Sequence, residues 1–295
     1  MKRASRSLRH TLGWLLVAGC SADPPVERTC INGAIDGPAI DAGDSFSILL
    51  YTYSTGYRHA SIPDGISAIR ALGAANGFTV DIAGTALDGR GSYCENRPTV
   101  GDSMTFTAEY LAKYAAVVFL HTTTTADTTL LDDTGKAVLE TYVHAGNGFV
   151  GIHAAADAEP GWSFYGDLVG ARFLAHGPPV TASLRIEDAA HPATSELPNP
   201  WSRHDEWFDF TVNPRSTAHV LIDLDEATYP DNPAPMGDHP IAWCKNVGAG
   251  RSFYTGLGHT SEAFADPLVR RHLLGGILYA AGVIPADCSV VPAGP

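Results

Sequence analysis

Four histidines stand where predicted β-strands end or soon after: His59, His121, His153 and His259. Imidazole serves as a base, an acid or a metal ligand near neutral pH. Ligands of an open parallel sheet bind beyond the carboxyl ends of its strands, because the loops converge there. A single histidine is as often a hydrogen-bonded or solvated side chain. Four of them at one edge favour a functional crevice.

A second group of polar residues lies in the later half of the chain, in "HDEWFDF" and "GDHPIAW". Asp205 and Glu206 are adjacent, so their side chains face different ways along an extended backbone. We expect one to be catalytic or metal-binding and the other structural, and the pattern does not say which. An aromatic ring such as that of Trp243 could face a sugar, although a place in the core is commoner for a single tryptophan.

The stretch "GIHAA" places His153 where a nucleophile elbow would carry a serine or cysteine. Acyl-enzyme chemistry at this position is therefore not supported, which leaves acid–base, electrophilic or metal-assisted chemistry. No strict metal signature is present, and His153 with Asp157 would form a ligand pair only if the intervening residues turn as a helix. The sequence also lacks a GxGxxG or Walker motif, so a nucleotide cofactor is not expected.

The elements that must position these residues alternate between strand and helix. Apolar runs predict strands at 46–53, 78–82, 115–121 and 148–153, and amphipathic or capped segments predict helices at 61–77, 107–114 and 132–146. This alternation predicts a doubly wound, mostly parallel sheet with helices on both faces. Beyond residue 160 we expect strands at 180–188, 219–225, 241–244 and 251–258 and a final helix at 266–282 within the same domain.

The N-terminus resembles an export signal. Four basic residues precede a short apolar run that ends in "VAGC", which is similar to the bacterial lipobox and predicts lipidation of Cys20; an ordinary signal peptide is the alternative. We divide the chain into a signal at 1–20, a tether rich in Pro, Gly and Asp at 21–44 and a domain at 45–285. The expected location is outside the cytoplasm, on a membrane through the lipid anchor only.

Charge and cysteine content narrow the class of partner. Without residues 1–19, the chain has 15 basic and 32 acidic residues, a net charge of −17. Nucleic acid is therefore not an expected partner. Four cysteines remain besides Cys20, and outside the cytoplasm they can form two disulfides in any of three pairings: Cys30, Cys94, Cys244 and Cys288.

Several motifs in series resemble the ThuA-like (trehalose utilisation) family of the class I glutamine amidotransferase-like superfamily. They run in order over residues 46–282: "GYRHASI", "GFVGIHAAAD", "WSFYGDLVGARFLAH", "AHPATSELP", "RHDEWFDF", "DHPIAWC", "GRSFYTGLGHT" and "RRHLLGGILYAAG". The resemblance implies a flavodoxin-like sheet without the amidotransferase cysteine. It also implies disaccharide catabolism, in particular of sugars oxidised to 3-keto forms.

The motif positions carried over by this resemblance give the candidate site. The candidate catalytic residues are His59, His153, Asp205, Glu206 and His259. The candidate substrate-binding residues are Tyr57, Arg58, Asp157, His176, His239, Trp243 and Arg251. His121 falls where relatives vary more, so it is left out of the set despite its position.

The leading hypothesis is an enzyme with lyase or hydrolase chemistry on 3-keto glycosides or disaccharides, supplied by a sugar-oxidising dehydrogenase of the same pathway. A 3-keto group acidifies the C2 proton, so the reaction needs a base, an acid and a group that stabilises an enolate. His153 is the expected base and Glu206 or Asp205 the acid. His59 with His259, or a divalent metal such as zinc held with His153, would stabilise the enolate. The alternatives are a non-catalytic sugar-binding domain and a metal-dependent hydrolase.

Overall fold

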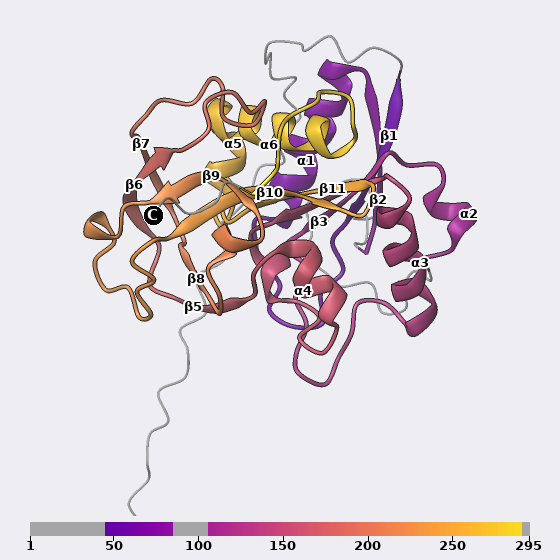
Figure 1. Cartoon of the computed structure of the whole chain (residues 1–295), viewed down its shortest axis with the longest axis horizontal. Helices are drawn as coiled ribbons and strands as arrows, with labels where there is room; N and C mark the ends of the chain where they lie inside the picture. Colours follow the sequence, from indigo (N-terminus) through magenta and orange to yellow (C-terminus); the bar gives the residue numbers. More distant parts are fainter. Residues whose placement is uncertain (1–44, 85–105, 291–295) are drawn as a thin grey trace, which may run out of the picture.

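A nine-stranded sheet forms the centre of the protein in the computed structural model, which describes residues 45–84 and 106–290 (Figure 1). The strands lie in the order β2-β1-β3-β4-β11-β10-β9-β6-β7. The first five are mutually parallel and the last four are joined by antiparallel pairing. The expected mostly parallel, doubly wound α/β sheet is confirmed, and β2-β1-β3-β4-β11 has the flavodoxin-like order.

The bounds of the parallel strands are β1 Phe46–Tyr51, β2 Phe78–Ala83, β3 Ala116–Leu120, β4 Gly148–Ile152 and β11 Gly250–Thr255. The antiparallel strands are β6 Val180–Ile186, β7 Trp201–Asp205, β9 His219–Leu224 and β10 Pro240–Val247. A separate antiparallel pair is formed by β5 Phe173–His176 and β8 Phe208–Phe210. Strands β5, β7 and β8 were not predicted from the sequence. β5 and β8 are short, and β7, with the sequence WSRHD, is mostly polar and leaves no apolar run.

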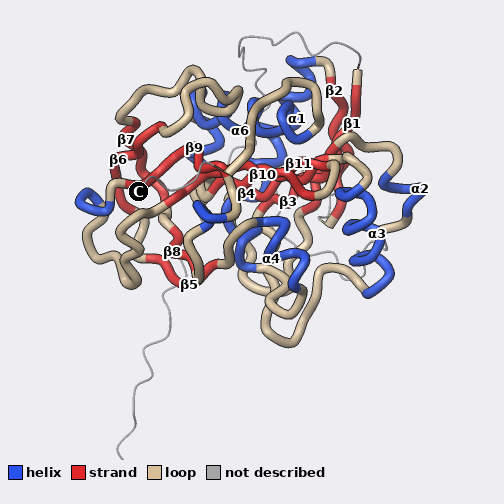
Figure 2. The backbone as a smooth tube through the Cα atoms, in the orientation of Figure 1, coloured by secondary structure: helices blue, strands red, loops and turns tan. Residues whose placement is uncertain are grey.

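Helices cover both faces of the sheet (Figures 1 and 2). One face carries α1 Ile62–Asn76, α5 Ser261–Ala265 and α6 Pro267–Ala280, which contact one another. The other carries α3 Asp133–His144 and α4 Ser163–Val169, with the single-turn α2 Ala108–Leu111 beside α3. The helix predicted at 107–114 is therefore shorter than expected. Short 3-10 helices lie at His153–Asp157, Pro214–Ser216 and Glu226–Thr228.

The strands at the centre of the sheet are apolar because both of their faces are covered. Every residue of β3 and β4 is buried, as expected for parallel strands between two helical layers. The expected caps are present at several helix ends: Gly77 ends α1 with φ +76°, and the side chains of Asp132 and Asp266 accept backbone N–H groups at the starts of α3 and α6. The two aspartates fix where the loops from the carboxyl edge end, and Gly77 fixes the turn from α1 into β2 at the amino edge.

A disulfide joins Cys244 of β10 to Cys288, which settles one pairing that the sequence left open. Cys30, Cys94 and the predicted signal and tether, including Cys20, lie outside the described residues. Among the described residues, no helix has the length and apolar character needed to cross a membrane.

Candidate active site

Histidines from four parallel strands meet at the carboxyl edge of the sheet. The ring of His59 lies with its centroid 4.5 Å from that of His121, 5.0 Å from that of His153 and 5.2 Å from that of His259. The rings of His153 and His259 are also 5.2 Å apart. The structure thus places His121 within the cluster, at the edge of the sheet where its place after a strand predicted it.

Two of these histidines hold an unusual backbone conformation. His121 has φ +51° and His153 has φ +50°, in the left-handed region that few residues other than glycine adopt. Both directly follow a strand, β3 and β4 respectively. His153 therefore stands on a sharp strand-to-helix turn like that of a nucleophile elbow, with an imidazole at the apex.

Glu206 connects three histidine rings. Its Oε2 atom lies 3.3 Å from His153 Nε2 and 3.2 Å from His259 Nδ1, while its Oε1 atom lies 3.1 Å from His176 Nδ1. Burial alone would raise the pKa of Glu206, but hydrogen bonds and charge interactions with His153 and His259 together lower it well below its ordinary value. A carboxylate held ionised in this way is a poor proton donor, so the expected role of Glu206 as the acid does not fit.

Asp205 is adjacent to Glu206 in the sequence, but it contacts backbone groups instead of histidine rings. Its fully buried carboxylate accepts the backbone N–H groups of Gly258 and His259, each at 2.9 Å, and that of Glu206 at 3.0 Å. Gly258 has φ +117°, a conformation that glycine tolerates. Asp205 thus fixes the backbone of the turn that carries His259. The expected catalytic role of Asp205 is corrected to positioning, because its oxygens are used by backbone groups.

The tautomer of His153 follows from its partner. Its Nδ1 lies 2.7 Å from the carbonyl oxygen of Gly256, which can only accept, so Nδ1 carries the hydrogen. In the neutral ring, Nε2 then presents a lone pair toward Glu206 and His259. Tyr254 donates its hydroxyl to the backbone oxygen of His153 at 2.8 Å, and the ring of Phe208 lies 4.3 Å from that of His153.

Sequence reasoning missed Phe208 and Tyr254 as neighbours of His153. Both aromatics lie in motifs that carry the family resemblance, "RHDEWFDF" and "GRSFYTGLGHT". Each was indistinguishable from an ordinary core residue, because alternation along a strand shows that a side chain is buried and does not show which ring it contacts.

The entrance to the cluster is lined by residues that are more exposed. Tyr57 is 66% exposed and meets His59 edge-on at 4.8 Å between ring centroids. Arg58 donates to the backbone oxygen of Thr52, and burial lowers its pKa. The side chain of His176 is 43% exposed. Burial raises the pKa of Asp157 to about 6, with opposing contributions from His176 and His153. Burial, and then the neighbouring His153 and His259, lower the pKa of His59 to about 2.

Three expected substrate-binding residues lie away from this entrance. Trp243 is buried, and its indole N–H donates to the backbone oxygen of Val169 at 2.7 Å. Arg251 pairs with Gly148 at the beginning of β4, which is the opposite end of the strand from His153. These two expectations are corrected: Trp243 is a core residue, and Arg251 is on the wrong edge of the sheet.

His239 is the third of these residues, and its ring is entirely buried. It lies 2.9 Å from Glu226 Oε1 through Nδ1 and 2.9 Å from the backbone oxygen of Phe208 through Nε2. The ring therefore has no surface for a substrate. His239 therefore supports the backbone of β8, and Phe208 of this strand packs on the ring of His153.

Comparison with known proteins identifies the family. The ThuA family, described as trehalose utilisation, matches residues 47–280. The chain belongs to the ThuA family. A ThuA-like protein from Bacteroides uniformis has 24% identity and a TM-score of 0.62, covering 82% of this chain and 94% of its own. One from Parabacteroides merdae has 20% identity and a TM-score of 0.60, covering 81% and 90%.

A cytoplasmic protein of Salmonella typhimurium shares the fold at 11% identity, with a TM-score of 0.52 and coverage of 79% of this chain and 98% of its own. A search of the curated proteins finds no match. The resemblance to ThuA proteins seen in the sequence is confirmed, and it establishes the family and its fold.

Within this ThuA-family chain, one group of side chains at the carboxyl edge has the composition of a metal site. One ligand atom from each of His59, His153, Glu206 and His259 lies within 4.8 Å of the others. Residues 153–157 do turn, as a 3-10 helix, yet Asp157 is not part of this group. The sequence allowed a ligand pair of His153 and Asp157 only on a helical turn. With three residues per turn, side chains four apart point about 120° away from each other, which explains why the pair does not form here.

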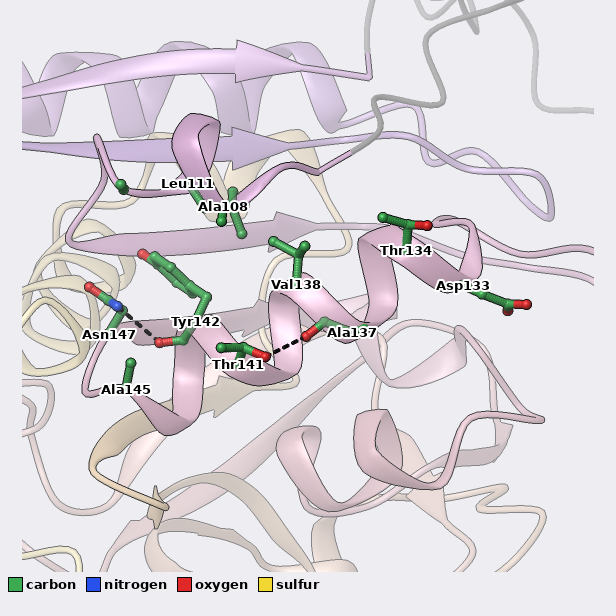
Figure 3. A pocket seen from close by; sticks show the side chains of 11 residues that line it. Ala108, Leu111, Asp133, Thr134, Ala137, Val138, Thr141, Tyr142, Ala145 and Asn147 are labelled. Atoms are coloured by element: carbon green, nitrogen blue, oxygen red, sulfur yellow. Dashed lines mark hydrogen bonds between the residues drawn. The ribbon is translucent and has the colours of Figure 1, made fainter.

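The ThuA domain also has an apolar groove between α2 and α3 (Figure 3). Its lining includes Leu111, Val138 and Tyr142, with Asp133 as its one carboxylate and no histidine. It offers no converging set of acid, base or ligand groups, so the chemistry is assigned to the histidine cluster.

Proposed function

We propose that the protein is an enzyme that cleaves a 3-keto glycoside or a similarly oxidised disaccharide at the histidine cluster. The observation that carries this proposal is the joining of three histidines by the buried Glu206 at the carboxyl edge of the sheet. Membership of a family described by the use of trehalose, a disaccharide, supports the substrate class. A sugar-oxidising dehydrogenase would be the source of the 3-keto substrate.

The reaction removes the C2 proton next to the ketone. The electron pair of the C–H bond moves into an enolate and then forms the C1–C2 double bond, while the C1–O bond breaks and the departing oxygen takes a proton. The products are an unsaturated 3-keto sugar and the released alcohol, and addition of water to the double bond would complete a hydrolysis. The enolate needs a positively polarised environment.

The geometry favours a division of roles that differs from the one expected from the sequence. His153 is fully buried and its Nε2 faces Glu206 and His259, so it suits charge stabilisation better than proton transfer to a sugar. Asp157, whose pKa of about 6 lies near neutrality, is the proposed base. His176, exposed at the entrance and in contact with Glu206, is the proposed acid. Tyr57 offers an exposed ring beside His59 for a sugar face.

The test is incubation with 3-keto-trehalose and 3-keto-sucrose beside their unoxidised parents, with released sugar followed by mass spectrometry. We expect turnover of the keto forms alone and a primary isotope effect with C2-deuterated substrate, because C2–H breaks. His204→Ala is the matched control, since His204 is exposed on β7 immediately before Asp205. Absence of turnover together with ligand-dependent thermal stabilisation would replace the enzyme by a sugar-binding domain.

The proposal extends to the location of the enzyme. Export and lipid anchoring through Cys20 are supported by the lipobox-like sequence and by the Cys244–Cys288 disulfide, because disulfides persist in oxidising compartments. Incorporation of labelled palmitate in the native host, lost in Cys20→Ala, is the expected result. A protein that remains unlabelled and is recovered from the cytoplasm would contradict it.

A further inference from the structure

We propose that His59, His153, His259 and Glu206 bind one divalent transition-metal ion of the zinc type. Imidazole nitrogen and carboxylate oxygen are ligands that zinc uses in catalytic sites. The binding itself does not depend on the proposed sugar chemistry, whereas the part the ion plays in the reaction rests on that proposed function.

The spacing of three ligand atoms is that of a coordination sphere. His153 Nε2, His259 Nδ1 and Glu206 Oε2 form a triangle with sides of 3.2, 3.3 and 3.3 Å. Tetrahedral bonds of about 2.0–2.1 Å place neighbouring ligand atoms about 3.3 Å apart. His59 completes the group, with all ligand atoms within 4.8 Å of one another.

The arrangement of hydrogens also calls for a cation. The Gly256 carbonyl fixes the hydrogen of His153 on Nδ1, so the Nε2 lone pair of the neutral ring faces the Glu206 carboxylate at 3.3 Å. The two atoms are held at this distance either by a second hydrogen, which makes His153 an imidazolium that donates to Glu206, or by a cation between them. A proton bridges one pair of the triangle at a time, while a metal ion at its centre attracts all three atoms.

The surroundings orient the ligands as second-shell groups do around bound metals. Ligating histidines commonly donate their other N–H to a carbonyl or carboxylate, and ligating carboxylates are themselves hydrogen-bonded. His153 does the first through Gly256, and Glu206 does the second through His176 on its other oxygen. Asp205 holds the backbone N–H of His259. These contacts would keep the ligand atoms in place before an ion arrives.

Access is from one side. His59, His153 and Glu206 are buried, while the side chain of His259 is 23% exposed. Four protein ligands fill a tetrahedral sphere, so a substrate oxygen would enter from the side of His259 as a fifth ligand, an expansion that zinc allows. When bound, such an ion would act as a Lewis acid toward a ketone oxygen.

Two other groups in the described residues have metal-ligand composition and lack these features. His191 lies with Cys244 and Cys288, whose sulfurs are already joined in the disulfide. Glu187, Asp223 and Asp238 are neutralised by ion pairs with Arg185 and Arg215. The histidine–glutamate group is therefore the one for which an added ion has an electrostatic purpose.

The experiment measures metal binding without using activity. The protein, expressed without a polyhistidine tag, is stripped with a chelator and titrated with Zn²⁺ by calorimetry, and Co²⁺ is added separately to record its visible spectrum. We expect one ion per chain and the intense d–d absorption of low-coordinate cobalt. Glu206→Gln and His259→Ala should weaken binding by about a hundredfold or more, and His204→Ala should bind as the wild type does.

Either of two results would overturn the proposal: substoichiometric binding to the wild type, or unchanged affinity in both ligand variants with native circular dichroism. The cobalt spectrum is recorded on the wild type, so it decides even if a variant fails to fold. If the protein binds one metal ion per chain but does not turn over 3-keto sugars, the proposed function is refuted and the proposed metal site still stands. If the metal-free protein turns over the substrate at the full rate, the proposed function is supported and the ion has no part in the reaction.

Discussion

The parallel and antiparallel halves of the sheet contribute different groups to one site. The parallel half supplies imidazoles, since β1, β3, β4 and β11 are each followed by a histidine of the cluster. The antiparallel half supplies carboxylates, because Asp205 ends β7 and Glu206 follows it. Convergence of the first group is a property of parallel topology. The carboxylates reach the same site only because the edge strand β7 of the antiparallel half lies close to it.

The antiparallel half must therefore curve so that the end of β7 lies beside the end of β11. β7 is four positions from β11 in the strand order, which would be about 19 Å in a flat sheet with ordinary strand spacing. The Asp205 carboxylate nevertheless accepts the N–H groups of Gly258 and His259 just after β11, at 2.9 Å. The two halves are therefore tied together at the point where the chemistry is expected.

The strongest test of this comparison is Glu206→Gln, which removes the charge of the carboxylate that contacts three of the histidines. We expect turnover of a 3-keto glycoside to fall by about 10³-fold, the upper part of the range for loss of one electrostatic group in an active site. Because the pKa of Glu206 is lowered in the folded protein, its charge also stabilises the fold near neutral pH. The variant should therefore melt lower at pH 7, with a difference from the wild type that shrinks as the pH falls below the ordinary pKa of a glutamate. Steady-state kinetics and thermal unfolding measure both effects.

Asp205→Asn is the matched comparison, because it is the adjacent residue with a structural role. Its amide cannot accept both the Gly258 and His259 N–H groups, and a buried donor left unsatisfied costs about 1–3 kcal/mol. This variant should lose stability as well as activity. An Asp205→Asn protein with the stability of the wild type would contradict the positioning role of Asp205.

The disulfide tests whether the antiparallel half contributes to stability independently of the site. Cys244 and Cys288 are separated by 44 residues, and closing a loop of that length stabilises the fold by about 4 kcal/mol in the chain-entropy account. The double variant Cys244→Ser, Cys288→Ser should lose a comparable amount in urea unfolding and keep its kcat below the transition. A large loss of kcat in the still-folded variant would show that the halves are coupled more widely than through Asp205.

The sequence was informative about the parallel half and less so about the antiparallel half. Fully buried strands such as β3 and β4 leave a strong apolar signal, and the loops that follow them can be assigned to one edge by topology alone. Short strands such as β5 and β8 leave no comparable periodicity. The opposite tasks of Asp205 and Glu206 could be anticipated from their adjacency, but which residue faced the histidines depended on long-range packing that no local pattern records.

Asp157 allows a pH test of the entrance to the cluster. Its folded pKa of about 6 lies above its ordinary value of 3.8, so a reaction that uses it as a base should accelerate as pH rises through about 6. Asp157→Asn should abolish this inflection and lower kcat by about 10²-fold. A carboxyl with a raised folded pKa costs stability above that pKa, so the variant should also melt higher at pH 8 and unchanged near pH 3. An inflection retained in the variant would move the base to another residue.

Substitution of Arg251 has the smallest expected effect, and it tests whether only the carboxyl edge of the sheet takes part in function. Arg251 is the second residue of β11 and lies beside Gly148 at the amino end of the parallel strands, whereas His259 lies beyond the carboxyl end of the same strand. If position along the strand decides function, Arg251→Gln should change kcat/KM by less than about twofold, as expected for a surface substitution away from the site. His259→Ala, measured on the same substrate, is the comparison variant and should lose activity strongly. A loss in Arg251→Gln approaching that of His259→Ala, in a protein of unchanged melting temperature, would mean that the amino edge of the sheet also takes part in binding.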